Sequence, residues 1–287
     1  YTGCNPKGLL LARDKALSKK ISTKLKSKLN QIPENEDVII DFSLCDFVDH
    51  SVMENMNNYV ETFKRKGGHL EIIGLDNYST RSEHPFALRK NIPDFIKPKE
   101  GVLTKRQKSL QKIGAELNLN YLPDQKEEIT ELPTFGYFKA RQIIKISNII
   151  SNGQCSLFDI EFSEGEMIAK QVLRTSMFYI KIDKEIPKFT LDKEGVFETI
   201  YHFTGFKDIS IENHPDFSKR FYLSGKNQVK IKELFTDELV LFFESNPYYH
   251  IESSDHGLLI LGKERLAGVK EIKALADFGF RLQKIIS

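Results

Sequence analysis

The sequence shows its clearest pattern of apolar and polar positions between residues 36 and 75. Residues 38–42 form a short apolar run, VIIDF, of the kind found in a strand that is buried on both faces. Further on, apolar side chains recur at the spacing of one helix face: Val52, Met56, Tyr59, Val60 and Phe63. Gly67 and Gly68 end this pattern, and an apolar stretch at 70–73 follows. The pattern predicts a βαβ unit with parallel strands and a right-handed crossover.

Three polar residues, Asp49, His50 and Ser51, lie where the predicted strand passes into the predicted helix. Ser51 and Glu54 have the spacing of a capping box, so we expect the Ser51 side chain to accept the backbone amide of Glu54. A catalytic triad would need the three side chains to converge. Consecutive residues leaving a strand point in different directions, so we expect no triad and interpret His50 as a loop or surface residue.

Residues 14–32 predict an amphipathic helix, because Leu17, Ile21, Leu25 and Leu29 recur every four positions. The opposite face of this helix carries lysines: Lys15, Lys19, Lys20, Lys24, Lys26 and Lys28. Such a face can simply be solvated. It can also contact an acidic partner or anionic lipid headgroups, where each nearby lysine contributes up to ~1 kcal/mol. Both interpretations stay open.

The segments VIIDFSLCDFVDHSVMENM and KRKGGHLEIIGL, within residues 36–75, resemble the STAS domain. This domain is shared by anti-sigma factor antagonists and by the cytoplasmic tails of SulP-family, sulfate permease-type anion transporters. The segment GLDNYSTRSEHPFALRK is most similar to the transporter tails. The resemblance implies a STAS-like α/β domain over residues 1–98, with βαβ units, a mixed sheet and helices. It also implies a regulatory or ligand-binding loop made by Asp49, His50, Ser51 and Glu54.

The sequence departs from the family's Asp-Ser-Ser-Gly loop, because it has Asp49, His50, Ser51 and Val52 there. Ser51 stands where the antagonists accept a phosphate, and Val52 replaces the glycine. A helix N-terminus favours a phosphate group, whereas Val52 can hinder a kinase and Glu54 adds a negative charge nearby. Ser51 can therefore be a phosphorylation site or only a helix cap, which is typically worth about 1 kcal/mol.

The second half of the chain has the pattern of an α+β domain with an antiparallel sheet. Residues 76–101, with Pro85, Pro93 and Pro98, predict an irregular connection. The pattern then predicts helix 104–119, strands at 141–150, 154–162 and 167–182, short helices at 195–203 and 228–243, a hairpin at 247–263 and helix 266–286. We therefore expect the STAS-like domain at 1–98, a linker with a helix at 99–134, and an α+β domain of unknown function at 135–287.

The composition is that of a folded chain, since 40% of the 287 residues are hydrophobic and 29% are charged. The net charge of +2 gives no signal for nucleic acid. Cys4, Cys45 and Cys155 are far apart and odd in number, which favours a reducing compartment over a disulfide framework. No run approaches the ~18 apolar residues of a membrane span, and no signal peptide is visible. The first residue is Tyr1, so we expect a piece of a longer protein.

The sequence contains no pattern that indicates a catalytic or metal centre. Its later histidines are scattered, without the spacing of a zinc site: His202, His214, His250 and His256. Asp159 and Glu161 alternate with apolar residues, so we expect them on an exposed strand face rather than as an acid–base pair. We expect no enzyme activity, no metal and no cofactor.

The resemblance implies a regulatory and interaction module of a membrane anion transporter of the sulfate type, on the cytoplasmic side of the inner or plasma membrane. The implied partners are the protein's own transmembrane domain, a second copy of the chain or a small nucleotide, and no nucleic acid. The alternative is a soluble partner switch like the anti-sigma factor antagonists, with Ser51 phosphorylated. An enzyme in the second half is a third alternative, which no motif supports.

Overall fold

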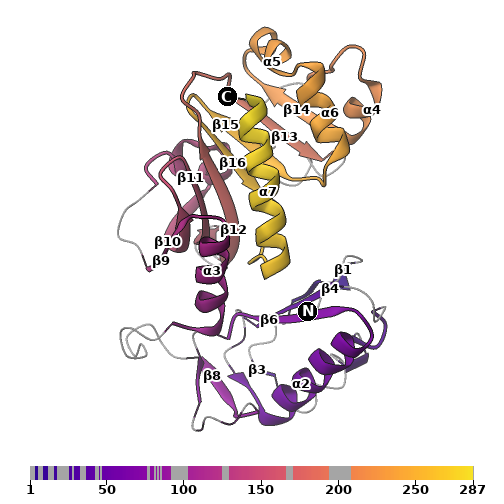
Figure 1. Ribbon diagram of the computed structural model, residues 1–287, viewed down its shortest axis with the longest axis vertical. Helices are drawn as coiled ribbons and strands as arrows, with labels where there is room; N and C mark the ends of the chain where they lie inside the picture. The colour runs from indigo at the N-terminus through magenta and orange to yellow at the C-terminus, as the bar shows by residue number, and fades with distance from the viewer. Residues whose placement is uncertain are drawn as a thin grey trace. The chain divides into compact units, whose positions relative to one another are not determined.

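The chain folds into two compact units, residues 1–106 and 107–287 (Figure 1). The computed structural model describes residues 4–5, 9–11, 16–17, 26–27, 29–32, 37–42, 45, 47–75, 78–80, 82, 84, 86–91, 103–124, 129–165, 171–193 and 208–286. Together the two units form a mixed α/β protein whose larger sheet is antiparallel. The helix predicted at 195–203 lies outside the described residues.

The first unit is built around the predicted βαβ unit. Strand β4 (Asp37–Asp41) is followed by the short strand β5 (Phe47–Val48) and then by helix α2 (His50–Arg65), and the chain returns as strand β6 (His69–Ile73). Strands β4 and β6 pair in parallel, as expected. The same sheet has the order β1-β2-β4-β6. Strand β2 (Leu9–Leu11) is parallel to β4, and β1 (Cys4–Asn5) is antiparallel to β2.

Helix α2 packs its predicted apolar stripe onto this sheet. Val52, Met56 and Phe63 are buried in one cluster with side chains of β4 and β6, and Tyr59 and Val60 pack against that cluster. After the helix, Gly67 has a φ of +85°, which residues with a side chain rarely adopt, and the chain turns back toward β6. The stripe prediction is therefore confirmed.

A second small sheet corrects two predictions. Its order is β3-β5-β8-β7, formed by Ala16–Leu17, Phe47–Val48, Arg89–Asn91 and Tyr78–Ser79 respectively. Leu17 was expected in a helix but pairs in parallel with Val48, and residues 76–101 were expected to be irregular. Strands of two or three residues have no readable periodicity, because hydrogen bonds to distant segments define them.

The second unit contains an eight-stranded antiparallel sheet of order β14-β13-β15-β16-β12-β11-β10-β9. Its strands are β9 (Asn120–Asp124), β10 (Arg141–Ser151), β11 (Cys155–Glu164), β12 (Gln171–Lys181), β13 (Phe189–Lys193), β14 (Phe221–Gly225), β15 (His250–Ser254) and β16 (Gly257–Leu261). The predicted meander β10–β12 and the hairpin β15–β16 are confirmed. Strands β9, β13 and β14 had no recognised signal.

Apolar side chains fill both faces of this sheet. On β12, Phe178 and Ile180 belong to one buried cluster, whereas Met177 and Tyr179 belong to another. Side chains of α3 (Lys105–Glu116), α5 (Gln228–Leu234), α6 (Asp237–Ser245) and α7 (Val269–Ile286) complete the first cluster, which also holds Phe217 of α4 (Pro215–Arg220). The short helices η1 (Leu132–Thr134) and η2 (Gly136–Phe138) complete the second cluster.

The sheet is therefore the middle of three layers, and Figure 1 shows α7 running along it. Helix α7 confirms the predicted C-terminal helix, and α5 and α6 together occupy the range predicted at 228–243. Helix α3 was expected in a linker, but its Leu110 and Ile113 are buried in the core of the second unit. Burying these two side chains ties α3 to the sheet, so it is part of that unit's fold rather than a connection.

Candidate functional site

The start of helix α2 is capped by Asp49, two residues earlier than expected. Asp49 has an extended backbone, with φ −76° and ψ 167°, and its carboxylate accepts the backbone N–H of Val52 at 2.8 Å. His50 is thus the first residue of α2 rather than a loop residue, and Ser51 is inside the first turn. The predicted Ser51–Glu54 capping box was wrong. The helix begins two residues earlier, and the Asp49 carboxylate accepts the Val52 amide in place of a Ser51 cap.

His50 meets a second histidine that is 34 positions away in the sequence. Its Nδ1 lies 2.6 Å from the backbone oxygen of Phe86, and the backbone N–H of Phe86 donates to Nδ1 of His84 at 3.2 Å. The imidazole centroids are 6.2 Å apart, and the Phe86 ring lies within 6.1 Å of His50 and 5.0 Å of His84. The result is a cluster of three rings, which we call the His50–His84 cluster.

The hydrogen bonds fix how the two imidazoles are protonated when neutral. A carbonyl oxygen can only accept, so His50 carries its proton on Nδ1 and keeps a lone pair on Nε2. An amide N–H can only donate, so Nδ1 of His84 is the acceptor and Nε2 of His84 carries the proton. Both histidines are exposed. The cluster therefore presents one acceptor and one donor to a partner, beside the first turn of α2.

The other residues of the expected regulatory loop are placed differently. Ser51 is half-buried and its backbone oxygen accepts the side-chain amide of Asn55 at 2.8 Å, whereas Glu54 is exposed. The Asp49 carboxylate is bonded to Val52 and the His50 ring to Phe86. Asp49 and His50 are thus directed at backbone groups, which is not the convergent arrangement of a triad. A role in recognition fits this geometry better than a role in catalysis.

The predicted lysine face is described only in part. Residues 26, 27 and 29 are helical, Lys26 is exposed and Leu29 is 1% exposed within the core of the first unit. Lys15, Lys19, Lys20, Lys24 and Lys28 lie outside the described residues.

A buried polar network in the second unit had no signal in the sequence. His250 on β15 lies between two carboxylates, with Nδ1 3.2 Å from Asp192 Oδ2 and Nε2 3.2 Å from Glu252 Oε1. Glu252 Oε2 accepts the backbone N–H of Tyr137 at 3.0 Å, and Asp192 Oδ1 accepts the hydroxyl of Tyr248. Asp192, His250 and Glu252 are each at most 7% exposed. The three side chains were missed because β13 and β15 bring them together from distant parts of the sequence.

The network holds a positive charge on His250. Burial alone would lower the pKa of His250, but the hydrogen bonds and charges of Asp192 and Glu252 outweigh it and raise the pKa to about 9. Burial would likewise raise the pKa of Asp192, whereas its bonds to His250, Tyr248 and the Lys193 amide lower it overall. The positive charge of His250 offsets only part of the negative charge of the two buried carboxylates beside it.

The structure corrects the expectation about Asp159. Asp159 was expected to be exposed, but it is 5% exposed and accepts Ser176 Oγ at 2.6 Å and Asn148 Nδ2 at 2.8 Å. The prediction was wrong because helices and loops cover both sheet faces, so alternation does not distinguish an exposed face. Within the described ranges, no group of His, Cys, Asp and Glu side chains is arranged to hold a metal ion.

Comparisons with known proteins leave the family of this chain open. No family model matches the sequence, and no curated protein matches it significantly. Among solved structures, the crystal structure of the mycobacterial trehalose monomycolate transport factor A, TtfA, is similar with a TM-score of 0.44 and 12% identity. The similarity covers 62% of this chain and 90% of that chain. A likeness this weak establishes neither a shared function nor a shared family. In the described part of the chain, no helix is both long enough and apolar enough to cross a membrane.

Proposed function

We propose that this chain is the regulatory and interaction module of a sulfate permease-type anion transporter, with a STAS-like first unit and no catalysis of its own. In this proposal, the chain controls transport by contacts with a transmembrane domain on the cytoplasmic side of the membrane. The start of α2 and the His50–His84 cluster form the contact surface.

The observation that carries the proposal is the parallel β4–α2–β6 unit. Its helix begins directly at the segment Asp49, His50 and Ser51, which is where the resemblance to STAS domains implies a regulatory loop. The segment that resembles transporter tails, SEHPFALRK, supplies His84 and Phe86 to the same place. The two parts of the resemblance thus converge on one exposed surface.

The charge distribution of α2 also favours an anionic group from a partner at this surface. The last turn of α2 carries Lys64 and Arg65, while its first turn contains no acidic residue. The positive end of the helix dipole lies at the first residue of α2, His50, and the His84 ring is 6.2 Å from the His50 ring. A partner carboxylate or phosphate would meet favourable electrostatics there, which suits recognition rather than bond cleavage.

The partner-switch alternative makes a different use of Ser51. It requires a kinase to reach the Ser51 hydroxyl, but Ser51 is half-buried and its neighbour Val52 is buried. No observation favours it over the transporter module. Phosphorylation of Ser51, which only the partner switch predicts, is therefore included in the test.

The test uses the full-length transporter with the change Ser51→Asp. A carboxylate in the first helical turn is tolerated, so we expect the fold to be kept while the added charge alters the contact surface. We expect uptake of radiolabelled sulfate to change by about fivefold, the lower end of typical coupling between sites. The matched control is Asn57→Asp, which adds the same charge at an exposed position further along α2 and should leave uptake unchanged.

Two further results complete this test. Equal uptake by the wild type, Ser51→Asp and His50→Ala would contradict the proposal, provided that circular dichroism shows all of them folded. Phosphate found on Ser51 of the protein isolated from its own cells would favour the partner switch instead.

A further inference from the structure

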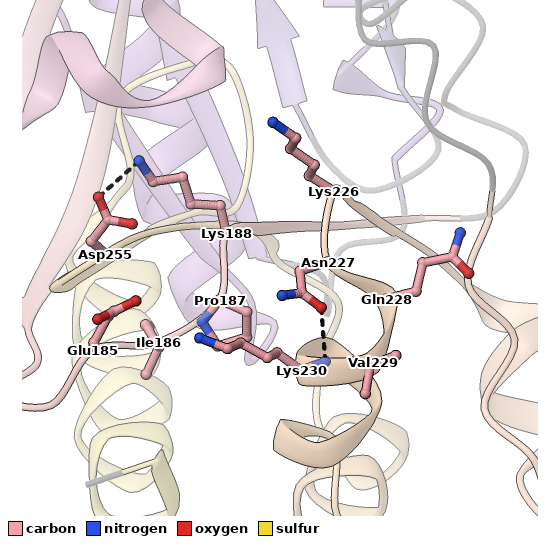
Figure 2. Close-up of a pocket in the computed structure, with 10 residues that line it drawn as sticks. All are labelled: Glu185, Ile186, Pro187, Lys188, Lys226, Asn227, Gln228, Val229, Lys230 and Asp255. Atoms are coloured by element: carbon pink, nitrogen blue, oxygen red, sulfur yellow. Dashed lines mark hydrogen bonds and ion pairs between the residues drawn. The ribbon is translucent and has the colours of Figure 1, made fainter.

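A pocket of about 620 Å³ opens in the second unit. One wall is the segment 185–188, which leads into β13, and the other is the segment 226–230, which follows β14 and includes the first residues of α5 (Figure 2). Asp255, in the turn between β15 and β16, closes one side. Ligand pockets of small molecules have volumes of roughly 300–1,000 Å³, so the size fits a small metabolite.

The first wall is anchored to the hairpin β15–β16. The backbone N–H of Ile186 donates to the backbone oxygen of Asp255 at 3.0 Å. Ser253 Oγ donates to the backbone oxygen of Pro187 at 2.8 Å and accepts the N–H of Phe189 at 2.7 Å. These bonds fix the backbone of 185–188, so the wall is already formed without a ligand.

The second wall is held close to the first by Gly225, the last residue of β14. A Cβ atom at this position would lie 2.5 Å from both the Lys188 backbone oxygen and Ile231 Cδ1, so only glycine permits this approach. Gly225 pairs with Phe189 at the end of the β13–β14 ladder. The pocket is therefore bounded by two rigid backbone segments rather than by long side chains alone.

The walls carry more positive than negative charge. Lys188, Lys226 and Lys230 line the pocket together with two acids, Glu185 and Asp255. Lys188 is paired with Asp255 at 2.8 Å. Among the described residues, neither Lys226 nor Lys230 has an ion-pair partner. In Figure 2 the Lys226 side chain points away from Asn227, whereas the Lys230 side chain extends toward Pro187. Two cationic groups are thus left for an anion.

Asn227 adds neutral donors between these lysines. Its side-chain oxygen accepts the backbone N–H of Lys230 at 3.2 Å, which orients the amide nitrogen away from α5, toward the wall that contains Pro187 in Figure 2. Pro187 and Val229 supply apolar surface, and Val229 is 69% exposed. The lining therefore combines cations and amide donors with an apolar surface that a ligand could cover.

We infer that this pocket binds a small metabolite that carries a phosphate group, with Lys226, Lys230 and the Asn227 amide as its phosphate ligands. Lysine is a common phosphate ligand that acts as a point charge and does not require bidentate geometry. The apolar surface of Pro187 and Val229 would accept the rest of the molecule. The site would make the second unit a ligand sensor, and it does not depend on the function proposed for the first unit.

The experiment measures binding to the full 287-residue chain by isothermal titration calorimetry at low ionic strength, using ADP, inorganic pyrophosphate and sulfate as probes. We expect ADP to bind more tightly than pyrophosphate, because only ADP can cover the apolar surface, and sulfate to bind most weakly. Lys226→Gln/Lys230→Gln should weaken ADP binding about tenfold or more, as expected when two charge-assisted hydrogen bonds are lost. Both lysines are exposed, so the variant should fold normally.

The matched control is Lys108→Gln/Lys139→Gln, which removes the same charge at exposed positions that do not line the pocket. We expect this control to bind ADP as the wild type does. The inference is overturned if neither ADP nor pyrophosphate binds the wild type. It is also overturned if the pocket variant and the control lose affinity equally, which would indicate a general effect of net charge.

Discussion

The buried His250 predicts a pH dependence of the second unit's stability. His250 lies between Asp192 and Glu252, both buried, and the ring of Tyr137 packs 6.0 Å away. Tyr248 donates to Asp192 from the far side. The pKa of His250 is raised to about 9 from 6.5, so the folded state holds the His250 proton more tightly than the unfolded chain does. The stabilisation is complete below pH 6.5 and is lost as the pH rises through 9.

The size of the effect follows from the shift in the pKa of His250 from 6.5 to about 9. At about 1.4 kcal/mol for each pKa unit, charging His250 contributes about 3 kcal/mol to the free energy of unfolding. Typical domains are stable by only about 5–15 kcal/mol. Raising the pH from 6 to about 10 should therefore remove a substantial part of the second unit's stability.

The assay compares the wild type with His250→Gln in urea unfolding experiments between pH 6 and 10. Methyl NMR signals of Ile251 and Ile260, both buried in the second unit, report on that unit alone. We expect the variant to be less stable by about 3 kcal/mol at pH 6, because two buried carboxylates then lose their cation. The stability difference between the two proteins should shrink as the pH rises through 9.

Other groups that titrate at high pH affect both proteins equally, so the variant serves as the control for them. A stability difference that stays constant from pH 6 to 10 would refute the reasoning. So would an NMR titration in which the His250 ring loses its proton near pH 6.5.

Three substitutions test helix capping and local packing. Asp49→Ala should lower the free energy of unfolding of the first unit by about 1 kcal/mol, since the Val52 amide loses its acceptor, and Ser51→Ala by less than about 0.5 kcal/mol. Equal losses in urea unfolding would show that Ser51 shares the capping role. Gly279→Ala should lower the melting temperature of the second unit, because the new Cβ would lie 2.1 Å from the Phe178 ring. This overpacking costs about 1–3 kcal/mol against a helix-propensity gain of about 1 kcal/mol, and an unchanged melting temperature would contradict it.

The sequence predicted the elements that have a local periodicity. The β4–α2–β6 unit, the meander β10–β12 and helix α7 are each long or regular enough to show their pattern within one segment. The pattern did not reveal β3, β5, β7 and β8, because two or three residues cannot show a period. Similarly, Asp49 and Ser51 are both good capping residues two positions apart, and only the backbone geometry decides that Asp49 is the cap.

Clusters that form between distant segments could not be predicted from the sequence, for a different reason. His250 and Asp192 are separated by 58 positions, and they meet only because β13 and β15 pair with Leu191 opposite Ile251. The His50–His84 cluster likewise depends on a hydrogen bond from His50 to Phe86, 36 positions away. A single sequence contains no signal for such pairings until the order of strands in the sheet is known.

A strongly perturbed pKa is often a sign of function, but burial decides against that interpretation for His250. Both ring nitrogens of His250 face carboxylates, and the side chain is almost fully buried. A ligand could reach His250 only if the sheet opened. The His50–His84 cluster has the opposite character, since both imidazoles are exposed and each fixes one nitrogen on the Phe86 backbone. The remaining Nε2 atoms can bind a partner without disturbing the core. We therefore expect a partner to bind at the His50–His84 cluster, whose polar groups are oriented by the fold and exposed to solvent. We expect the buried network of His250 to affect the stability of the second unit.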